Sequence, residues 1–283
     1  MRRWHTMALA VLIGLTALVP AFTFAGPTER VTSGNKVQDG GYPWLVSVQL
    51  PLLPGNGPLK HHLCGGTLID STHVLTAAHC TVFRDDRTIP AKEYKVYYGS
   101  TQLGERGRFE EVSRVIAHPN YNPRTVRNDV AILVLKNPIE GIVPISLPEA
   151  GDRSGSREND RVIVSGWGST KQFGGNKGSR IRTTRDLMEA NIEVLSMERC
   201  KASLRHIGAT GVDGDSMFCA MEGSKDACYG DSGGPLFFQQ GDTPMQVGIV
   251  SWGIGCGLRF PGIYTRISDP SIRNWIADVV GEP

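Results

Sequence analysis

The stretch Asp226-Ala-Cys-Tyr-Gly-Asp-Ser-Gly-Gly-Pro235 sets one serine among glycines, and Ser232 is its candidate functional residue. A serine hydroxyl is a weak nucleophile, so chemistry at Ser232 needs a base within reach and donors for the oxyanion that forms. Gly230, Gly233 and Gly234 allow a tight turn in which the amides of Gly230 and Ser232 can point into one small space. Such glycine clusters also occur in ordinary turns, so this stretch alone indicates a catalytic site only weakly.

Two segments further upstream supply the groups that such a serine requires. Thr76-Ala-Ala-His-Cys80 contains His79, and Asn128-Asp-Val-Ala-Ile-Leu133 contains Asp129. The three segments follow one another in the order His, Asp, Ser. In this combination the chain resembles the trypsin/chymotrypsin family of serine proteases, and the resemblance covers nearly everything from Val31 to the end of the chain.

The resemblance implies a catalytic triad. In the template of this protease family, His79 would take the proton of Ser232 and later pass it to the leaving amine, while Asp129 would hold the imidazole and stabilise its cation. The amides of Gly230 and Ser232 would bind the oxyanion. The alternative for Asp129 is a turn or cap aspartate after Asn128, but a carboxylate directly before an apolar run is placed for burial and needs a partner.

The resemblance also implies a substrate-binding pocket. Asp226 lies six residues before Ser232, where the family has the base of its primary pocket, and an aspartate there implies recognition of Arg or Lys before the scissile bond. The alternative is a solvated loop charge after Lys225. The residues that match the walls of the pocket are Ser251, Trp252, Gly253 and Gly262.

Ala227 departs from the serine that trypsins often have beside this aspartate. A guanidinium group can bond a carboxylate through two parallel hydrogen bonds, whereas an ammonium group gains more from an additional hydroxyl. We therefore predict that Arg is preferred over Lys before the scissile bond.

The bulk composition is that of a globular protein without affinity for nucleic acid. The chain has 283 residues, enough for one large all-β domain or two lobes with their own cores. Lys and Arg number 30 against 28 Asp and Glu, and the resulting net charge of +2 gives no basic footprint for nucleic acid. A hydrophobic content of 40% argues against a disordered chain.

Short segments rich in apolar and β-branched residues, bounded by turn formers, predict strands in two clusters. They are residues 44–50, 65–69, 94–98 and 130–135, then residues 161–165, 189–194, 235–238, 245–250 and 262–265. With the resemblance, they predict an all-β fold of two packed antiparallel six-stranded β-barrels, at about residues 44–140 and 160–267. A C-terminal α-helix is expected at about residues 270–280, with Asp269 or Ser271 as its cap.

The six cysteines are Cys64, Cys80, Cys200, Cys219, Cys228 and Cys256. Their spacings contain no CxxC pair and no Cys/His cluster of the kind that binds zinc. An even count behind a secretory leader predicts a disulfide framework, although the count alone leaves the pairing open. The resemblance selects the pairs Cys64–Cys80, Cys200–Cys219 and Cys228–Cys256.

Residues 1–25 have the pattern of a signal peptide, with Arg2 and Arg3, an apolar core at residues 7–19 and small residues up to Ala25. An uncleaved membrane anchor is the alternative, but Pro20 and the small residues near the end favour cleavage. The predicted localisation is therefore secreted, without membrane association once the signal peptide is removed.

Residues 26–30 are then a short propeptide, and residues 31–283 form the protease domain. The resemblance implies that cleavage after Arg30 frees the amine of Val31, which folds inward and pairs with Asp231. A buried carboxylate without a cation is unfavourable, so this pairing can drive a loop rearrangement. Val31-Thr-Ser-Gly34 departs from the family's usual Ile-Val-Gly-Gly opening, and the alternative for Arg30 is a surface residue in a linker.

No cofactor and no metal are expected. Calcium requires hard oxygen ligands, but the segment after Gly99 is shorter than the calcium loop of the family and carries Arg106 and Arg108 where acids would help. The other histidines lie in the leader or in polar or loop-like contexts, and no role is assigned to them: His5, His61, His62, His73, His118 and His206.

These features predict a secreted, monomeric trypsin-like serine endopeptidase, made as a zymogen and acting through an acyl-enzyme. Its expected partners are protein or peptide substrates with Arg or Lys at the cleavage site, and protein protease inhibitors. The alternative is a catalytically inactive homologue that binds proteins; such relatives usually lose a triad residue. An esterase of the nucleophile-elbow type does not fit, because Ser232 lacks the Gly-x-Ser-x-Gly frame and its histidine precedes it.

Overall fold

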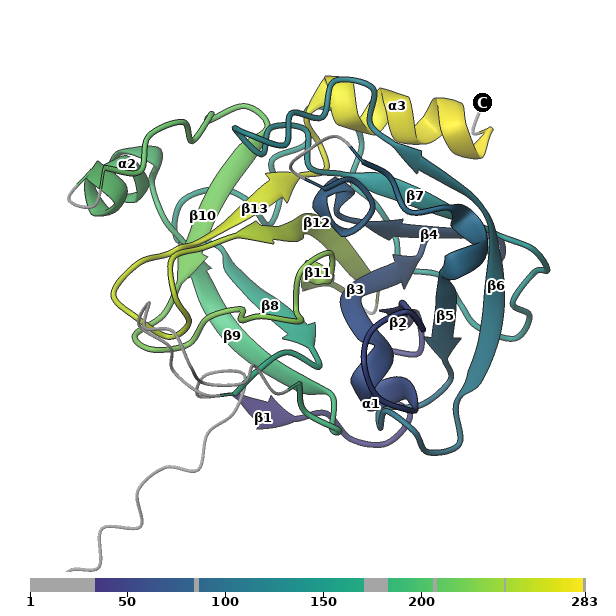
Figure 1. Cartoon of the computed structure of the whole chain (residues 1–283). Coiled ribbons are helices and arrows are strands. Elements are labelled where there is room, and N and C mark those ends of the chain that lie inside the picture. Colours follow the sequence, from purple (N-terminus) through teal and green to yellow (C-terminus); the bar gives the residue numbers. More distant parts are fainter. Residues whose placement is uncertain (1–33, 84–86, 171–182, 206–207, 242, 282–283) are drawn as a thin grey trace, which may run out of the picture.

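The computed structural model describes residues 34–83, 87–170, 183–205, 208–241 and 243–281 (Figure 1). The predicted signal peptide and propeptide, together with Arg30 and Val31, lie outside these residues.

The first half of the chain forms a closed barrel of six antiparallel strands in the order β2-β3-β4-β7-β6-β5. Their bounds are β2 (Leu45–Gln49), β3 (His62–Leu68), β4 (His73–Thr76), β5 (Lys95–Tyr98), β6 (Arg108–Ala117) and β7 (Ala131–Leu135). The strands β2 and β7 are buried along their whole length, which explains why they read as continuous apolar runs in the sequence. Two short elements in this half are α1 (Pro58–His61) and the 3₁₀ turn η2 (Ala91–Glu93).

The second half forms a sheet in the order β9-β10-β13-β12-β11-β8, and the pairing of β8 with β9 closes it into another six-stranded barrel. Its strands are β8 (Arg161–Gly166), β9 (Met188–Val194), β10 (Met217–Met221), β11 (Pro235–Gln240), β12 (Thr243–Trp252) and β13 (Gly262–Arg266). The helix α2 (Met197–Arg205) lies between β9 and β10. The predicted fold of two six-stranded barrels is therefore confirmed.

Each end of the described chain packs on the barrel that is farther from it in sequence (Figure 1). The short strand β1 (Asn35–Lys36) pairs with β9 of the second barrel. The predicted C-terminal helix is present as α3 (Pro270–Val280), and it buries Ile272 and Ile276 in the core of the first barrel. Of the two candidate caps, Asp269 fills the role, because its side chain accepts hydrogen bonds from the amides that begin α3.

The loop between β5 and β6 is organised by one phenol. The hydroxyl of Tyr97 accepts from the amides of Gly104 and Gly107 at 3.2 and 3.1 Å. Its single proton is shared between the carbonyls of Gln102 and Glu105, at 3.1 and 3.0 Å. The Tyr97 hydroxyl thus provides a hydrogen-bond partner for the backbone groups that face the centre of the loop.

Among the described residues, no helix is long and apolar enough to cross a membrane.

Candidate active site

His79 and Asp129 are brought together by two strand ends of the first barrel. The strand β4 ends at Thr76, and the 3₁₀ turn η1 (Ala78–Cys80) follows and carries His79. His79 Nδ1 lies 2.8 Å from Asp129 Oδ2, and the amide of His79 donates to Asp129 Oδ1 at 2.8 Å. One carboxylate therefore holds both the ring and the backbone of the histidine.

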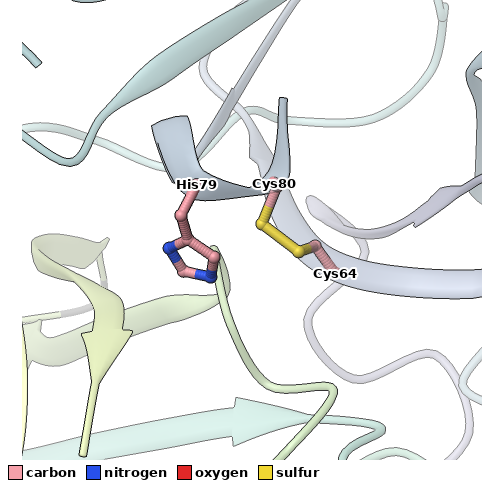
Figure 2. Close-up of side chains that lie close together, drawn as sticks. All are labelled: Cys64, His79 and Cys80. Carbon is pink, nitrogen blue, oxygen red and sulfur yellow. A yellow bond between two sulfur atoms is a disulfide. The ribbon is translucent and has the colours of Figure 1, made fainter. Parts of the chain in front are cut away.

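The turn that carries His79 is braced by a disulfide. Figure 2 shows the imidazole beside the bond that ties Cys80 to Cys64 of β3. The sulfur atoms of these two cysteines and a ring nitrogen of His79 lie within 4.8 Å of one another. Both sulfur atoms belong to the disulfide, so neither cysteine can bind a metal ion as a thiolate.

Asp129 is fully buried and has partners from the second barrel as well. Its Oδ2 accepts from the hydroxyl of Ser251 at 2.5 Å, and its main-chain carbonyl accepts from the hydroxyl of Thr265 at 3.0 Å. Burial by itself would lower the pKa of His79, but the charge and hydrogen bond of Asp129 outweigh it and raise that pKa. Asp129 therefore stabilises the imidazolium form of His79.

Ser232 lies in a turn wedged between the two barrels. Its carbonyl accepts from the amide of Gly65 in β3 at 2.7 Å. The next residue, Gly233, has φ of +76°, and a Cβ there would lie 2.2 Å from the hydroxyl of Thr76 and 3.0 Å from the amide of Ala77. The serine turn thus lies against the end of β4, three residues before His79. Among the described residues, no hydrogen bond joins the Ser232 hydroxyl to His79, a contact that is often long in structures without substrate.

The two amides predicted to bind an oxyanion are free in the described part of the chain. The amide of Asp231 donates to the carbonyl of Cys228 at 2.9 Å, and that of Gly233 donates to Val250 at 2.8 Å. The amides of Gly230 and Ser232, on either side of Asp231, donate to none of the described residues. Gly230 has φ of +101°, which favours glycine and sets the course of the turn.

A pocket of about 190 Å³ opens beside Ser232. All the predicted substrate-binding residues contribute to its lining: Asp226, Ser251, Trp252, Gly253 and Gly262. Asp226 is only 4% exposed, and burial is the main reason why its pKa rises to about 7. A carboxylate in such a place gains most from a cation that enters the pocket.

Tyr264 also contributes to the pocket, and its role was not predicted from the sequence. Its hydroxyl is buried and has no hydrogen-bond partner among the described residues. A Cβ built on Gly262 would lie 2.9 Å from this hydroxyl and 2.9 Å from Asp226 Oδ1. The two polar groups therefore face one narrow space, which exists because residue 262 has no side chain.

Asp231 is 1% exposed, and among the described residues only backbone amides bond its carboxylate. Its Oδ1 accepts from Gly168 at 2.7 Å and its Oδ2 accepts from Cys228 at 2.9 Å. Burial raises its pKa to about 6. The predicted partner of Asp231, the amine of Val31, lies outside the described residues.

The three predicted disulfides are confirmed as Cys64–Cys80, Cys200–Cys219 and Cys228–Cys256. The last of these lies in the pocket wall, immediately after Ala227.

Two histidines differ from the polar or loop-like context expected for them. His62 is a buried residue of β3. The ring of His118 packs against Trp275 of α3, with the two ring centroids 5.0 Å apart. The adjacent pair His61 and His62 gives no sign of this in the sequence, because only the register of β3 decides which of the two points inward.

Two antiparallel barrels with a histidine, a buried aspartate and a serine at their junction define a serine hydrolase of the two-barrel type. The family model for trypsin matches residues 31–276. Trypsin of Phaedon cochleariae is 35% identical over 280 residues, 96% of each chain. Venom serine protease Bi-VSP of Bombus ignitus is 37% identical over 253 residues, 84% of this chain and 66% of that protein. Trypsin epsilon of Drosophila erecta is 33% identical over 276 residues, 95% of this chain and 97% of that one. The chain belongs to the trypsin family of serine proteases.

Gly253 and Gly262 of the pocket wall offer a matched pair of substitutions. In Gly262→Ala the new Cβ lies 2.9 Å from Asp226 Oδ1, whereas in Gly253→Ala the nearest atom is the Cα of Gly262 at 3.9 Å. We expect Gly262→Ala to weaken the binding of benzamidine, a small aromatic cation, by roughly tenfold or more, and Gly253→Ala by less than about threefold. Titration calorimetry measures both, and equal losses would contradict this description of the pocket.

Proposed function

We propose that this protein is a secreted trypsin-like serine endopeptidase, made as a zymogen, that hydrolyses peptide bonds after Arg and Lys through an acyl-enzyme. The observation that carries the proposal is the buried carboxylate of Asp226 in a pocket that opens beside Ser232. Membership of the trypsin family and the His79–Asp129 contact support the same activity.

The chemical steps follow the template of this family. The hydroxyl of Ser232 attacks the carbonyl carbon of the substrate, and its proton passes to Nε2 of His79. The buried charge of Asp129 stabilises the imidazolium, which then protonates the leaving amine. Water, deprotonated by the same imidazole, attacks the acyl-enzyme and releases the acid, and Ser232 regains its proton.

The developing oxyanion meets the amides of Gly230 and Ser232. These amides have no other partner among the described residues, so they are available to a substrate without breaking an existing hydrogen bond. In comparable sites one such donor contributes about 3–4 kcal/mol to the stability of the transition state.

Activation is proposed to follow cleavage after Arg30. Asp231 is buried with amide donors but without a cation among the described residues, and such a carboxylate favours an incoming positive charge. The described chain starts on the side of the second barrel that holds Asp231. Lys36 of β1 and Gly166 of β8 both pair with Met188 of β9, and a Cβ on Gly166 would lie 2.2 Å from Asp231 Oδ1.

The proposed function predicts how the precursor is activated. Purified precursor should be inactive on a short amide ending in Arg, and limited trypsin treatment should release a Val31 N-terminus together with activity. Ser232→Ala, cleaved in the same way, should reduce kcat by several orders of magnitude because the nucleophile is lost. N-terminal sequencing and an amidase assay measure this. A clean Val31 terminus without turnover would instead favour the second candidate, an inactive homologue that binds proteins.

The second prediction concerns the choice between Arg and Lys. Ala227 has no hydroxyl beside Asp226 for an ammonium group to use, so kcat/KM should be higher for an Arg amide than for the matched Lys amide. Ala227→Ser should narrow that ratio by improving the Lys substrate. Equal turnover of the two substrates by the unsubstituted enzyme would contradict the proposal.

The third prediction concerns pH. The pKa of Asp226 in the empty pocket is raised to about 7, mainly by burial, and only its ionised form attracts a cation. Benzamidine should therefore bind tightest above pH 7 and weaken by up to about tenfold for each unit below it. Calorimetry between pH 8 and 5 tests this, with Asp226→Asn as the control. A variant that keeps the full pH dependence would show that another group is responsible.

A further inference from the structure

The loop between β5 and β6, residues 99–107, carries one exposed arginine in a conformation that few side chains adopt. Arg106 has φ of +59°, which lies in the left-handed region. The amide of Gly107 donates to the carbonyl of Glu105 at 2.8 Å, so these three residues form a γ-turn centred on Arg106. Arg106 is therefore accessible to solvent, while the backbone around it is folded back on itself.

A protease that cuts after arginine requires a different conformation of its substrate. Cleavage occurs where the backbone can leave its own hydrogen bonds and enter the cleft of the protease. In the Arg106–Gly107 bond, the nitrogen that becomes the new amine belongs to Gly107, and its N–H group donates to Glu105 and to the hydroxyl of Tyr97. This bond thus follows a residue that the proposed pocket accepts, but its backbone is not free while the loop is closed.

The neighbouring Arg108 does not offer a comparable bond. It lies in β6, where it pairs with Tyr98 of β5, and its guanidinium lies over the ring of Tyr98 at 5.2 Å from the centroid. To present Arg108, the molecule must separate two strands of the first barrel, whereas the turn at Arg106 can open with those strands still paired. Of these two arginines, Arg106 is the one that a local opening presents to a protease.

The hydroxyl of Tyr97 holds this turn closed from the inside of the molecule. Tyr97 is 2% exposed, and its hydroxyl accepts from the amides of Gly104 and Gly107. A Cβ built on Gly107 would lie 2.4 Å from the hydroxyl oxygen and 2.1 Å from the ring carbon that bears it, so the backbone lies directly against the phenol. The amide of Gly104 donates to no other group among the described residues. Loss of the hydroxyl would therefore weaken the closed form of the loop.

The same loop is linked to the segment behind the active site. The carbonyl of Thr101 accepts from Nε1 of Trp167 at 3.1 Å. The residue after Trp167 is Gly168, whose amide donates to the carboxylate of Asp231, next to the nucleophile. A cut in the loop would thus release one end of a set of contacts that extends to the catalytic turn.

We propose that the Arg106–Gly107 bond is a latent self-cleavage site of this protease and that the Tyr97 hydroxyl keeps it closed, an inference that rests on the cleavage after Arg proposed above. One molecule cuts another, and the added water leaves a carboxyl group on Arg106 and a free amine on Gly107. A short loop opens and closes faster than it is cut, so the rate of cleavage follows the fraction of molecules in which the loop is open.

The substrate proteins for the test all carry Ser232→Ala, so that they cannot cut one another. Tyr97→Phe removes the hydroxyl and keeps the ring. Tyr98→Phe is the matched control, because the adjacent hydroxyl forms no hydrogen bond among the described residues. Adding Arg106→Gln to Tyr97→Phe removes the residue that the protease recognises.

Gly104→Ala opens the loop by a second route, in case Tyr97→Phe does not fold. Gly104 has φ of +92°, which disfavours any side chain, and a Cβ there would meet no atom within 4 Å. The substitution therefore strains the closed loop and leaves the packing of the barrel unchanged.

Each protein is incubated with a trace of the activated, unsubstituted enzyme and, in parallel, with pancreatic trypsin. Mass spectrometry follows the fragment that begins at Gly107, which separates without reduction because no disulfide spans the bond. We expect Tyr97→Phe to be cut after Arg106 roughly 10- to 100-fold faster than Tyr98→Phe, and Gly104→Ala to be cut several-fold faster. The variant that also carries Arg106→Gln should give no such fragment.

Equal rates of this cut in Tyr97→Phe, Gly104→Ala and Tyr98→Phe would overturn the inference. If Tyr97→Phe is cut faster at every Arg and Lys bond, it has lost its fold and Gly104→Ala decides: selective cleavage after Arg106 supports the inference, and an unchanged rate overturns it. If pancreatic trypsin cuts Tyr97→Phe after Arg106 but the activated enzyme cuts none of the proteins, the proposed function fails, while the closure of the bond by Tyr97 stands.

Discussion

The close approach of two backbones at the junction of the barrels is the contact on which the site depends. Gly65 of β3 donates to the carbonyl of Ser232 at 2.7 Å, and a Cβ on Gly65 would lie 2.8 Å from the Cα of Gly234. No side chain fits between these segments, so the serine turn lies directly on the barrel that carries His79 and Asp129. The distance between the serine turn and the first barrel is therefore set by contact between two backbones, which cannot approach more closely. The side chains of the site are then placed by this backbone contact.

Three buried carboxylates lie at this junction, and each has a different set of partners. Asp129 has His79 and Ser251 as its hydrogen-bond partners. Asp226 has a raised pKa in a pocket of about 190 Å³. Asp231 has only backbone amides among the described residues, in a space bounded by glycines. Each carboxylate is therefore a site where a different positive group is favoured.

The sequence predicts most parts of the structure whose residues are buried on both sides or belong to a motif, but the short buried strands β4 and β10 were missed. The strand β7 is buried throughout and is visible as an apolar run, while β6 exposes much of its length and carries charged residues, so its ten residues escaped notice. The helix α2 buries only Cys200 and Leu204, too few for a clear pattern. The triad and pocket residues were expected from motifs, but the burial of His62 was not, because its ring bonds a carbonyl 168 residues away in the sequence.

The exchange of chain ends between the barrels has a mechanical consequence. A force applied to the two ends would act first on β1, a pair of residues held to β9, and on α3, which is held by one apolar face. Peeling either end uncovers part of the other half of the molecule before any barrel strand is drawn out. The two halves are thus fastened across each other, and these outer contacts must be released before the barrel strands beneath them bear the force.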